Sequence, residues 1–380
     1  MEDEVRATGL APAPDREPRA PRRGRRSPFR HPRHDRQERS NERSSRSEDP
    51  EAGDSDVRGP TYAALDLGTN NCRLLVARAT RDSFRVIDAF SRIIRLGEGI
   101  TASGRLSAAA IARAVDALRV CRIKMRNRGV VRTRLIATEA CRAAANGGDF
   151  LERVRNEVGI ELEIVDRETE AGLAATGCTP LIDPQAKGVI LFDIGGGSSE
   201  LVRLGRCAPT RHGPPHPDIS AWMSIPVGVV TLAERYGGVT VGRDLFELMI
   251  EEVTAHISDF AAANGGTDGI HLLGTSGTVT TIAGVYLELP RYERRRVDGC
   301  WMSGAQVDDV VERLLGMSYE SRVANPCIGV ERADLVLAGC AILEAIRRAF
   351  PCDRLRVADR GLREGMLVQM MREDGVWDEA

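Results

Sequence analysis

Two segments of the chain share one pattern: an apolar run, an aspartate, a turn of small residues and a second apolar run. The first spans residues 64–71 and reads ALDLGTNN, and the second spans residues 191–202 and reads LFDIGGGSSELV. The pattern predicts two buried strands joined by a tight turn. Backbone N–H groups of such turns can surround a phosphate, and each aspartate stands where a bound metal ion would lie. Two copies that face each other would form a phosphate clamp between two similar domains.

The residues around these segments predict the same order of elements twice. Strands are expected at 62–67, 73–79, 84–96, 133–138 and 162–165, and again at 188–193, 201–204, 220–226, 269–274 and 355–358. Apolar periodicity predicts helices at 107–127, 150–158, from 168, and at 241–263, 279–285, 305–315, 332–349 and 362–372. The repeat indicates a duplicated α/β fold with a ligand cleft between its halves.

We therefore expect one domain over residues 60–174 and a second over 175–361, and leave open whether the C-terminal helix at 362–376 joins the first. Residues 1–59 have almost no aliphatic side chains after Leu10, and positions 16–46 hold twelve arginines against four acidic residues. Such a segment cannot bury enough surface to offset its ordering entropy, so a disordered arm is expected. The arm is either a solvated leader or a polybasic segment that contacts a polyanion weakly.

Composition excludes some classes of protein. The net charge of −2 favours neither nucleic acid nor a membrane surface, and no apolar run reaches the ~18 residues that a membrane span needs. The nine cysteines contain no CxxC pair and no secretory signal precedes them, so reduced thiols in a cytoplasmic protein are expected. His212 and His216 lack a third metal ligand and are expected in a surface loop.

Small-residue turns supply the candidate phosphate sites. The glycines at 195–197 directly follow an apolar strand, which is unfavourable unless the backbone approaches another group closely. Asp193 and Glu200 flank this turn and would suit a hard divalent cation. Residues 274–278 form a third turn, GTSGT, at a helix N-terminus, where free N–H groups bind anions. The alternative for the turn at 68–71 is an ordinary hairpin. For the turn at 195–198 it is a flexible loop, and for the turn at 274–278 it is a plain strand–helix connection.

Two charged residues are candidates for the chemistry itself. Arg142 follows a strand that ends at Thr138, and it is either a bidentate phosphate ligand or a surface arginine. Glu168 and Glu170 begin a helix. Such carboxylates usually compensate the helix dipole, but one of them could instead act as a general base that orients water.

Six motifs occur together and in order: DLGTNN, ATEACR, DRETEA, LFDIGGGSSEL, LLGTSGT and LREGML. With them the chain resembles the exopolyphosphatase / guanosine-pentaphosphate phosphatase family, from about residue 62 to residue 370. The resemblance implies two ribonuclease-H-like (actin-like ATPase) domains, and an enzyme that uses Mg²⁺ to release terminal phosphate from inorganic polyphosphate. Guanosine pentaphosphate (pppGpp), a substrate in stringent-response signalling, is the alternative, and a homodimer is the expected assembly. A nucleotide-dependent actin-like switch or a polyanion sensor is the alternative of another class.

The resemblance also implies roles for individual residues. Glu170 matches the family's catalytic base, and Arg142 matches the arginine that contacts phosphate. The matching phosphate-binding positions are Asp66, Gly68, Thr69, Asn70, Gly195, Gly196, Gly197, Ser198, Gly274, Ser276, Gly277 and Thr278. The implied Mg²⁺ ligands are Asp193, Glu200 and, by way of water, Asp66.

Three positions depart from the family pattern. Thr169 replaces the first of two adjacent carboxylates, Arg167 stands at a glycine position, and Thr69 replaces a serine. None of these changes removes a proposed catalytic group. Arg167 adds positive charge beside Glu170, where it would lower the pKa of Glu170 or contact phosphate. The chain ends soon after the LREGML motif, as expected for the short two-domain form of the family.

Overall fold

The computed structural model describes residues 59–207 and 210–378, and these residues all belong to one compact unit. The arm predicted over residues 1–59 therefore lies outside the described residues, apart from Gly59. In the described part of the chain, no helix combines the length and the apolar character that crossing a membrane requires.

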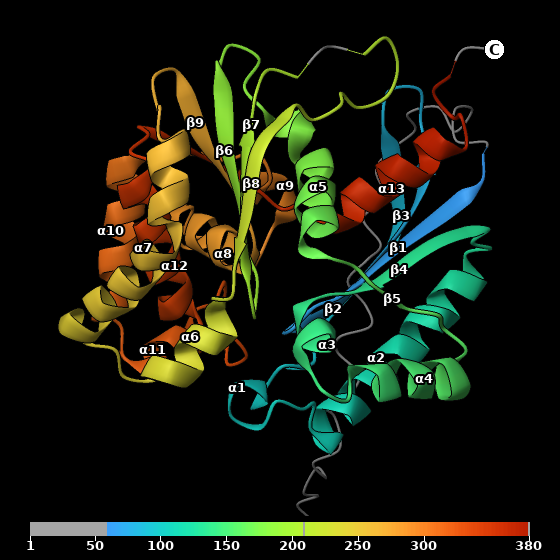
Figure 1. Ribbon diagram of the computed structural model, residues 1–380, viewed down its shortest axis with the longest axis horizontal. Helices are drawn as coiled ribbons and strands as arrows, with labels where there is room; N and C mark the ends of the chain where they lie inside the picture. Colours follow the sequence, from blue (N-terminus) through green and yellow to red (C-terminus); the bar gives the residue numbers. More distant parts are fainter. Residues whose placement is uncertain (1–58, 208–209, 379–380) are drawn as a thin grey trace, which may run out of the picture. The chain divides into compact units, whose positions relative to one another are not determined.

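The first half of the chain forms a five-stranded sheet in the order β3-β2-β1-β4-β5 (Figure 1). Its strands are β1 (Thr61–Leu67), β2 (Asn71–Ala79), β3 (Phe84–Ile93), β4 (Arg132–Ala137) and β5 (Glu163–Ile164). The first three strands form an antiparallel meander, and β4 and β5 run parallel to β1.

The second half repeats this topology with one addition. Its sheet has the order β10-β11-β9-β6-β7-β8, so β8-β7-β6-β9-β11 matches the order of the first sheet and β10 extends the edge. Its strands are β6 (Gly188–Ile194), β7 (Ser199–Leu204), β8 (Ile219–Ile225), β9 (Ile270–Thr275), β10 (Trp301–Ser303) and β11 (Arg354–Ala358). The predicted duplicated α/β fold is confirmed.

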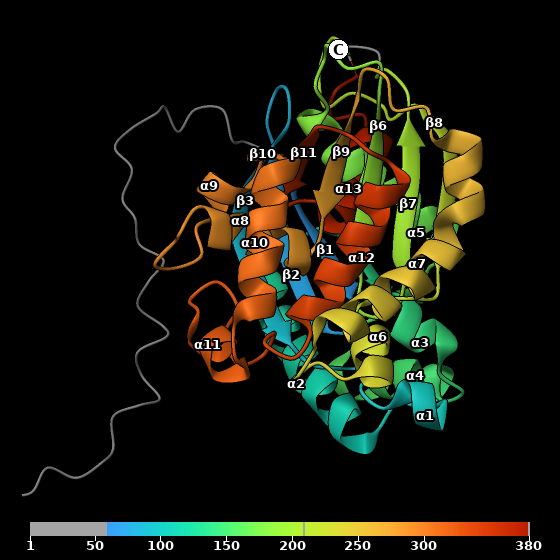
Figure 2. The same ribbon diagram turned by 90° about the vertical axis from the view of Figure 1, so that its left-hand side faces the viewer.

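Helices cover both faces of each sheet, because strand side chains alternate between the faces. In β1, Ala63 and Leu65 belong to the core under α2 and α4, whereas Tyr62 and Ala64 pack against α13. Figures 1 and 2 show α7, α10 and α12 on one side of the second sheet. The helices are α1 (Ile100–Ser103), α2 (Ala108–Asn127), α3 (Glu139–Ala143), α4 (Gly147–Val158), α5 (Arg167–Cys178), α6 (Val229–Tyr236), α7 (Arg243–Asn264), α8 (Gly277–Tyr286), α9 (Arg294–Val297), α10 (Gly304–Gly316), α11 (Tyr319–Ala324), α12 (Val336–Ala349) and α13 (Leu362–Glu373), with a 3₁₀ turn at Thr179–Leu181.

Two helices exchange partners between the sheets. Helix α5 follows the first sheet in sequence but packs on the second, and α13 follows the second sheet but packs on the first. The two helices cross closely, since a Cβ atom added to Gly365 would lie 2.0 Å from the carbonyl oxygen of Leu173. Only glycine fits there. The domain boundary drawn between residues 174 and 175 stays a prediction, because contacts across the α5–α13 crossing join the two halves.

The sequence-based element prediction missed seven short elements. These are α1, α3, α6, α9, α11, β10 and the 3₁₀ turn, all of eight residues or fewer. Such segments are too short for periodicity to separate them from loops. The helix expected from residue 332 begins at Val336, which leaves Arg332 in the preceding turn. The strand expected to reach residue 96 ends at Ile93, and Arg95 then takes a positive φ of 45°.

Candidate active site

A cavity of about 890 Å³ is lined by residues from both sheets. Asp66, Asp193, Thr275 and Ala358 lie in this lining, at or near the carboxyl ends of β1, β6, β9 and β11. In sheets with parallel strands, ligands bind beyond the carboxyl ends of the strands. The topology alone therefore marks this cavity as the candidate active site.

The two repeated hairpins place their turns against each other in the cavity. Gly68 N–H donates to Asn71 O at 2.9 Å, and Gly195 N–H donates to Ser198 O at the same distance, so the turns close in the same way. A Cβ atom added to Gly197 would lie 2.9 Å from Thr69 Oγ1. The glycines predicted to allow a close approach thus make room for the opposite turn.

The hairpins differ where their strands pair. In the first, Asp66 lies opposite Arg73, and in the second, Asp193 lies opposite Glu200. Like charges placed directly opposite each other destabilise a sheet. Since Glu200 is only 3% exposed, water offers it little relief, and the second hairpin is therefore a favourable place for a cation.

Four of the carboxylates that line the cavity have a raised pKa: Asp66, Glu170, Asp193 and Glu200. Burial raises the pKa of Asp193 to about 7, and the charge of Glu170 adds to this increase. Burial also raises the pKa of Glu200 to about 7, and the charge of Asp193 adds to that increase. Burial and the charge of Glu200 raise the pKa of Glu170 to about 8. Burial also raises the pKa of Asp66, against the opposing charge of Arg73.

These carboxylates fit a cation that keeps much of its water. Among the described residues, no three His, Cys, Asp or Glu side chains form a ready-made metal-binding group. Mg²⁺ typically binds through one or two carboxylates, several waters and substrate phosphate oxygens. Asp193 and Glu200 could supply such a partial ligand set, and Ser198 and Ser224 donate hydrogen bonds that orient Glu200.

Arg142 lies behind the cavity surface rather than in its lining. Its Nη2 donates to Glu170 Oε2 at 3.2 Å and to Glu139 Oε2 at 2.5 Å, and its Nη1 donates to the carbonyl oxygen of Val165. The structure thus brings Arg142 and Glu170 together. The expectation that Arg167 lowers the pKa of Glu170 is wrong, because the guanidinium of Arg167 pairs with Glu139 while burial raises the pKa of Glu170.

The third predicted turn contributes three of its four proposed residues. Ser276, Gly277 and Thr278 line the cavity, and Ser276 caps α8 by accepting a hydrogen bond from Val279 N–H at 3.1 Å. Gly274 lies outside the lining, and a Cβ atom added there would meet the ring of Phe192 at 2.5 Å. Its small size serves packing beneath the turn.

Sequence reasoning missed a set of arginines in the lining: Arg73, Arg92, Arg294, Arg332, Arg360 and Arg363. Within the described chain, Arg73, Arg332 and Arg363 form no ion pair with a carboxylate, although Arg332 Nη1 donates to Thr281 Oγ1. Burial lowers the pKa of Arg332 and of Arg363, and the nearby charge of Arg73 adds to both shifts. Arg73 could have been found, because it follows Asp66 by seven positions as Glu200 follows Asp193.

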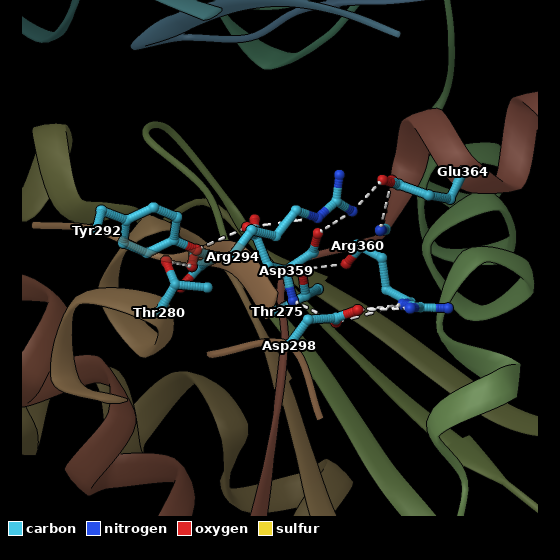
Figure 3. Close-up of polar contacts among 10 residues, drawn as sticks. Thr275, Thr280, Tyr292, Arg294, Asp298, Asp359, Arg360 and Glu364 are labelled. Atoms are coloured by element: carbon cyan, nitrogen blue, oxygen red, sulfur yellow. Dashed lines mark hydrogen bonds and ion pairs between the residues drawn. The ribbon is translucent and has the colours of Figure 1, made fainter. Parts of the chain in front are cut away.

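A polar network holds the turn between β11 and α13 (Figure 3). Arg363 lies in the first turn of α13. Arg294 Nη2 donates to Glu364 Oε1 at 2.8 Å, and Glu364 Oε2 accepts from Gly361 N–H at 2.9 Å, which caps α13. The hydroxyl of Tyr292 donates to Asp359 Oδ2 at 2.6 Å, and Arg360 pairs with Asp298. The network therefore fixes the start of α13 at the edge of the cavity.

Known proteins are similar to this chain in sequence and in fold. The model of the Ppx/GppA phosphatase family matches residues 75–374. Exopolyphosphatase 2 of Mycobacterium tuberculosis is 27% identical over 329 residues, covering 81% of this chain and 98% of that protein. The solved Aquifex aeolicus member of the Ppx/GppA family is 26% identical, with a TM-score of 0.68 over 84% of this chain and 99% of its own.

A solved exopolyphosphatase from Cytophaga hutchinsonii has a TM-score of 0.75 at 23% identity, over 82% of this chain and 98% of its own. At that identity the likeness speaks for the fold alone. The family match covers most of the described chain, and it includes the second glycine turn, Glu170 and α13. This chain therefore belongs to the Ppx/GppA phosphatase family and is a phosphoanhydride hydrolase.

Proposed function

We propose that this chain is an exopolyphosphatase that releases terminal phosphate from inorganic polyphosphate with the help of Mg²⁺. The observation that carries the proposal is that buried carboxylates and arginines line the same cavity. Asp193, Glu200 and Glu170 line the cavity together with Arg73, Arg332 and Arg363. Within the described residues, these three arginines form no ion pair with a carboxylate. A chain of phosphates is the ligand that such unpaired guanidinium groups suit.

The two glycine turns would bind the terminal phosphoryl group through backbone N–H groups. Glu170 orients a water molecule and accepts its proton as the water oxygen bonds to phosphorus. The bridging P–O bond then breaks, and orthophosphate leaves the shortened chain. Arg142 holds the Glu170 carboxylate and supplies positive charge near the developing negative charge. Mg²⁺, held through Asp193 and Glu200 and by water to Asp66, would neutralise phosphoryl oxygens.

A second substrate, pppGpp, ends in the same phosphoanhydride and would use the same reaction centre. The observation in its favour is the apolar part of the lining, where Ile328, Val330 and Leu335 would suit a nucleoside. Polyphosphate remains our first choice, because the unpaired arginines serve a longer phosphate chain better. The family membership supports an enzyme over a nucleotide-dependent switch or a polyanion sensor.

The test compares phosphate release from long-chain polyphosphate and from pppGpp at equal Mg²⁺, with Glu170→Gln as the inactive control. Preferential release from polyphosphate that the substitution abolishes would support the proposal. Preferential release from pppGpp would mean that pppGpp, and not polyphosphate, is the preferred substrate. No release from either by a folded protein would contradict the proposal and favour the switch or sensor.

We also propose a cytoplasmic homodimer whose arginine-rich arm attracts polyanions without being required for catalysis. The arginine surplus between residues 16 and 46 supports the role of the arm. Deleting residues 1–58 should slow polyphosphate association at low salt and leave kcat unchanged, since steering acts on the encounter rate. Complete loss of binding would make the arm the binding module instead, and light scattering would test the dimer.

A further inference from the structure

Four charged side chains from α3 and α5 form one connected group beside the cavity: Glu139, Arg142, Arg167 and Glu170. We propose that Glu139 and Arg167 act as a matched positioning pair, in which Glu139 holds Arg142 against Glu170 and Arg167 neutralises the charge of Glu139. This inference rests on the proposed function, because it concerns how a polyanion is accepted next to an acidic residue.

The geometry assigns Glu139 the central place in the group. Its Oε2 accepts from both Nε and Nη2 of Arg142, at 3.0 and 2.5 Å, which fixes the plane of that guanidinium. The same Nη2 reaches Glu170 Oε2 at 3.2 Å. Oε1 of Glu139 accepts from Arg167 Nη2 at 3.0 Å. The orientation of the catalytic carboxylate therefore depends on Glu139 through one shared nitrogen.

Glu139 also faces the substrate side, which Arg142 and Arg167 do not. It lines the cavity, and a Cβ atom added to Gly197 would lie 3.1 Å from its Cγ. The carboxylate thus stands beside the second glycine turn, where a phosphoryl group is expected. A bare carboxylate at this position would repel a polyanion, and its side chain is only 13% exposed, so water would screen it poorly.

Two guanidinium groups remove this conflict. Burial raises the pKa of Glu139, but the hydrogen bonds from Arg167 and Arg142 outweigh burial and hold the pKa below its ordinary value. Glu139 is therefore ionised and fully paired. Because Arg142 is shared with Glu170, the charge balance at Glu139 depends on Arg167. Arg167 stands where the family has a glycine, and its pairing with Glu139 explains this change.

The test is a double-mutant cycle on phosphate release from polyphosphate, with Arg167→Ala, Glu139→Gln and both together. Arg167→Ala should raise KM about 10-fold, since an uncompensated carboxylate then faces the substrate, and Arg167→Lys should restore it. Glu139→Gln should lower kcat by about 10-fold with little change in KM, the usual size of an orienting contact. In the Glu139→Gln background, Arg167→Ala should no longer raise KM.

The matched control is Arg155→Ala, which removes an arginine paired with an exposed glutamate, Glu161, outside the cavity, and should change neither constant. Melting temperatures identify any variant that fails to fold, and Glu139→Gln and Arg167→Lys preserve side-chain size. Equal increases in KM in both backgrounds, or an unchanged kcat for Glu139→Gln, would overturn the positioning pair. If the wild-type protein releases no phosphate, the proposed function fails, and the same cycle read as Kd for polyphosphate still decides the charge balance between Glu139 and Arg167.

Discussion

The hairpins β1–β2 and β6–β7 share a turn length, a closing hydrogen bond and a register, yet they differ in the side chain that lies opposite the aspartate. Arg73 lies across from the aspartate in the first hairpin, and Glu200 lies across from it in the second. In the first hairpin, the charge of Arg73 opposes the effect of burial on the pKa of Asp66. The second gathers two buried carboxylates whose pKa values rise to about 7.

The difference shows how one backbone device supports two kinds of chemistry. The repeated turn supplies N–H groups in both hairpins, and the residue seven positions after the aspartate sets the local charge. We infer that the first hairpin serves phosphate and the second serves a cation. Substitutions can break this division of labour one hairpin at a time.

The largest effect is expected at Glu170, which lies between the acidic hairpin and Arg142. Glu170→Gln should reduce kcat by about 10²–10⁴-fold, because a positioned general base contributes that much. Glu168→Gln is the matched control, since Glu168 lies on the same helix, is exposed and does not line the cavity. If Glu170→Gln keeps a turnover within a few-fold of wild type, Glu170 is not the general base.

The next effect concerns the acidic hairpin. Glu200→Gln should raise the Mg²⁺ concentration for half-maximal activity by about 10- to 100-fold, as expected when a metal site loses a well-oriented group. Without metal, the same change should raise the melting temperature, because it relieves repulsion between Glu200 and the buried Asp193. A lower melting temperature together with unchanged Mg²⁺ dependence would mean that Glu200 has a structural role instead.

A smaller effect is expected at the cationic hairpin. Arg73→Ala should raise KM for polyphosphate about 10-fold, the value of one charge-assisted hydrogen bond. Its Mg²⁺ dependence should stay at the wild-type value. Arg78→Ala provides the control, because Arg78 lies on the same strand, bonds Thr61 and does not line the cavity.

The smallest effect is a pH dependence of stability. The raised pKa values of Asp193, Glu200 and Glu170 mean that the folded state keeps protons that the unfolded chain has released well below neutral pH. Between the ordinary carboxyl pKa of about 4 and the folded values of about 7 to 8, the folded state binds more protons than the unfolded chain, so stability falls as the pH rises across this range. The melting temperature without metal should fall from about pH 4 to about pH 8 by more for wild type than for Glu200→Gln, and Mg²⁺ should reduce the fall. An equal fall in melting temperature in both proteins would contradict the assignment of the pH dependence to these carboxylates.

Much of the fold and part of the site could be predicted from the sequence, because both depend on local patterns. The two motifs located Asp66 and Asp193, and the repeated order of strands predicted the duplicated sheets. The sequence did not reveal that Arg332, in the turn before α12, and Arg363, in the first turn of α13, reach the cavity. It also did not reveal that α5 and α13 exchange sheets. Both features depend on tertiary packing between residues far apart in the chain.

The most direct test of the division between the hairpins is a pair of titrations on wild type, Arg73→Ala and Glu200→Gln. Phosphate release is measured against polyphosphate at saturating Mg²⁺, and against Mg²⁺ at saturating polyphosphate. The account predicts that Arg73→Ala shifts only the polyphosphate curve and Glu200→Gln only the Mg²⁺ curve. Equal shifts of both curves in both variants would contradict it, because the two hairpins would then act as one undivided site.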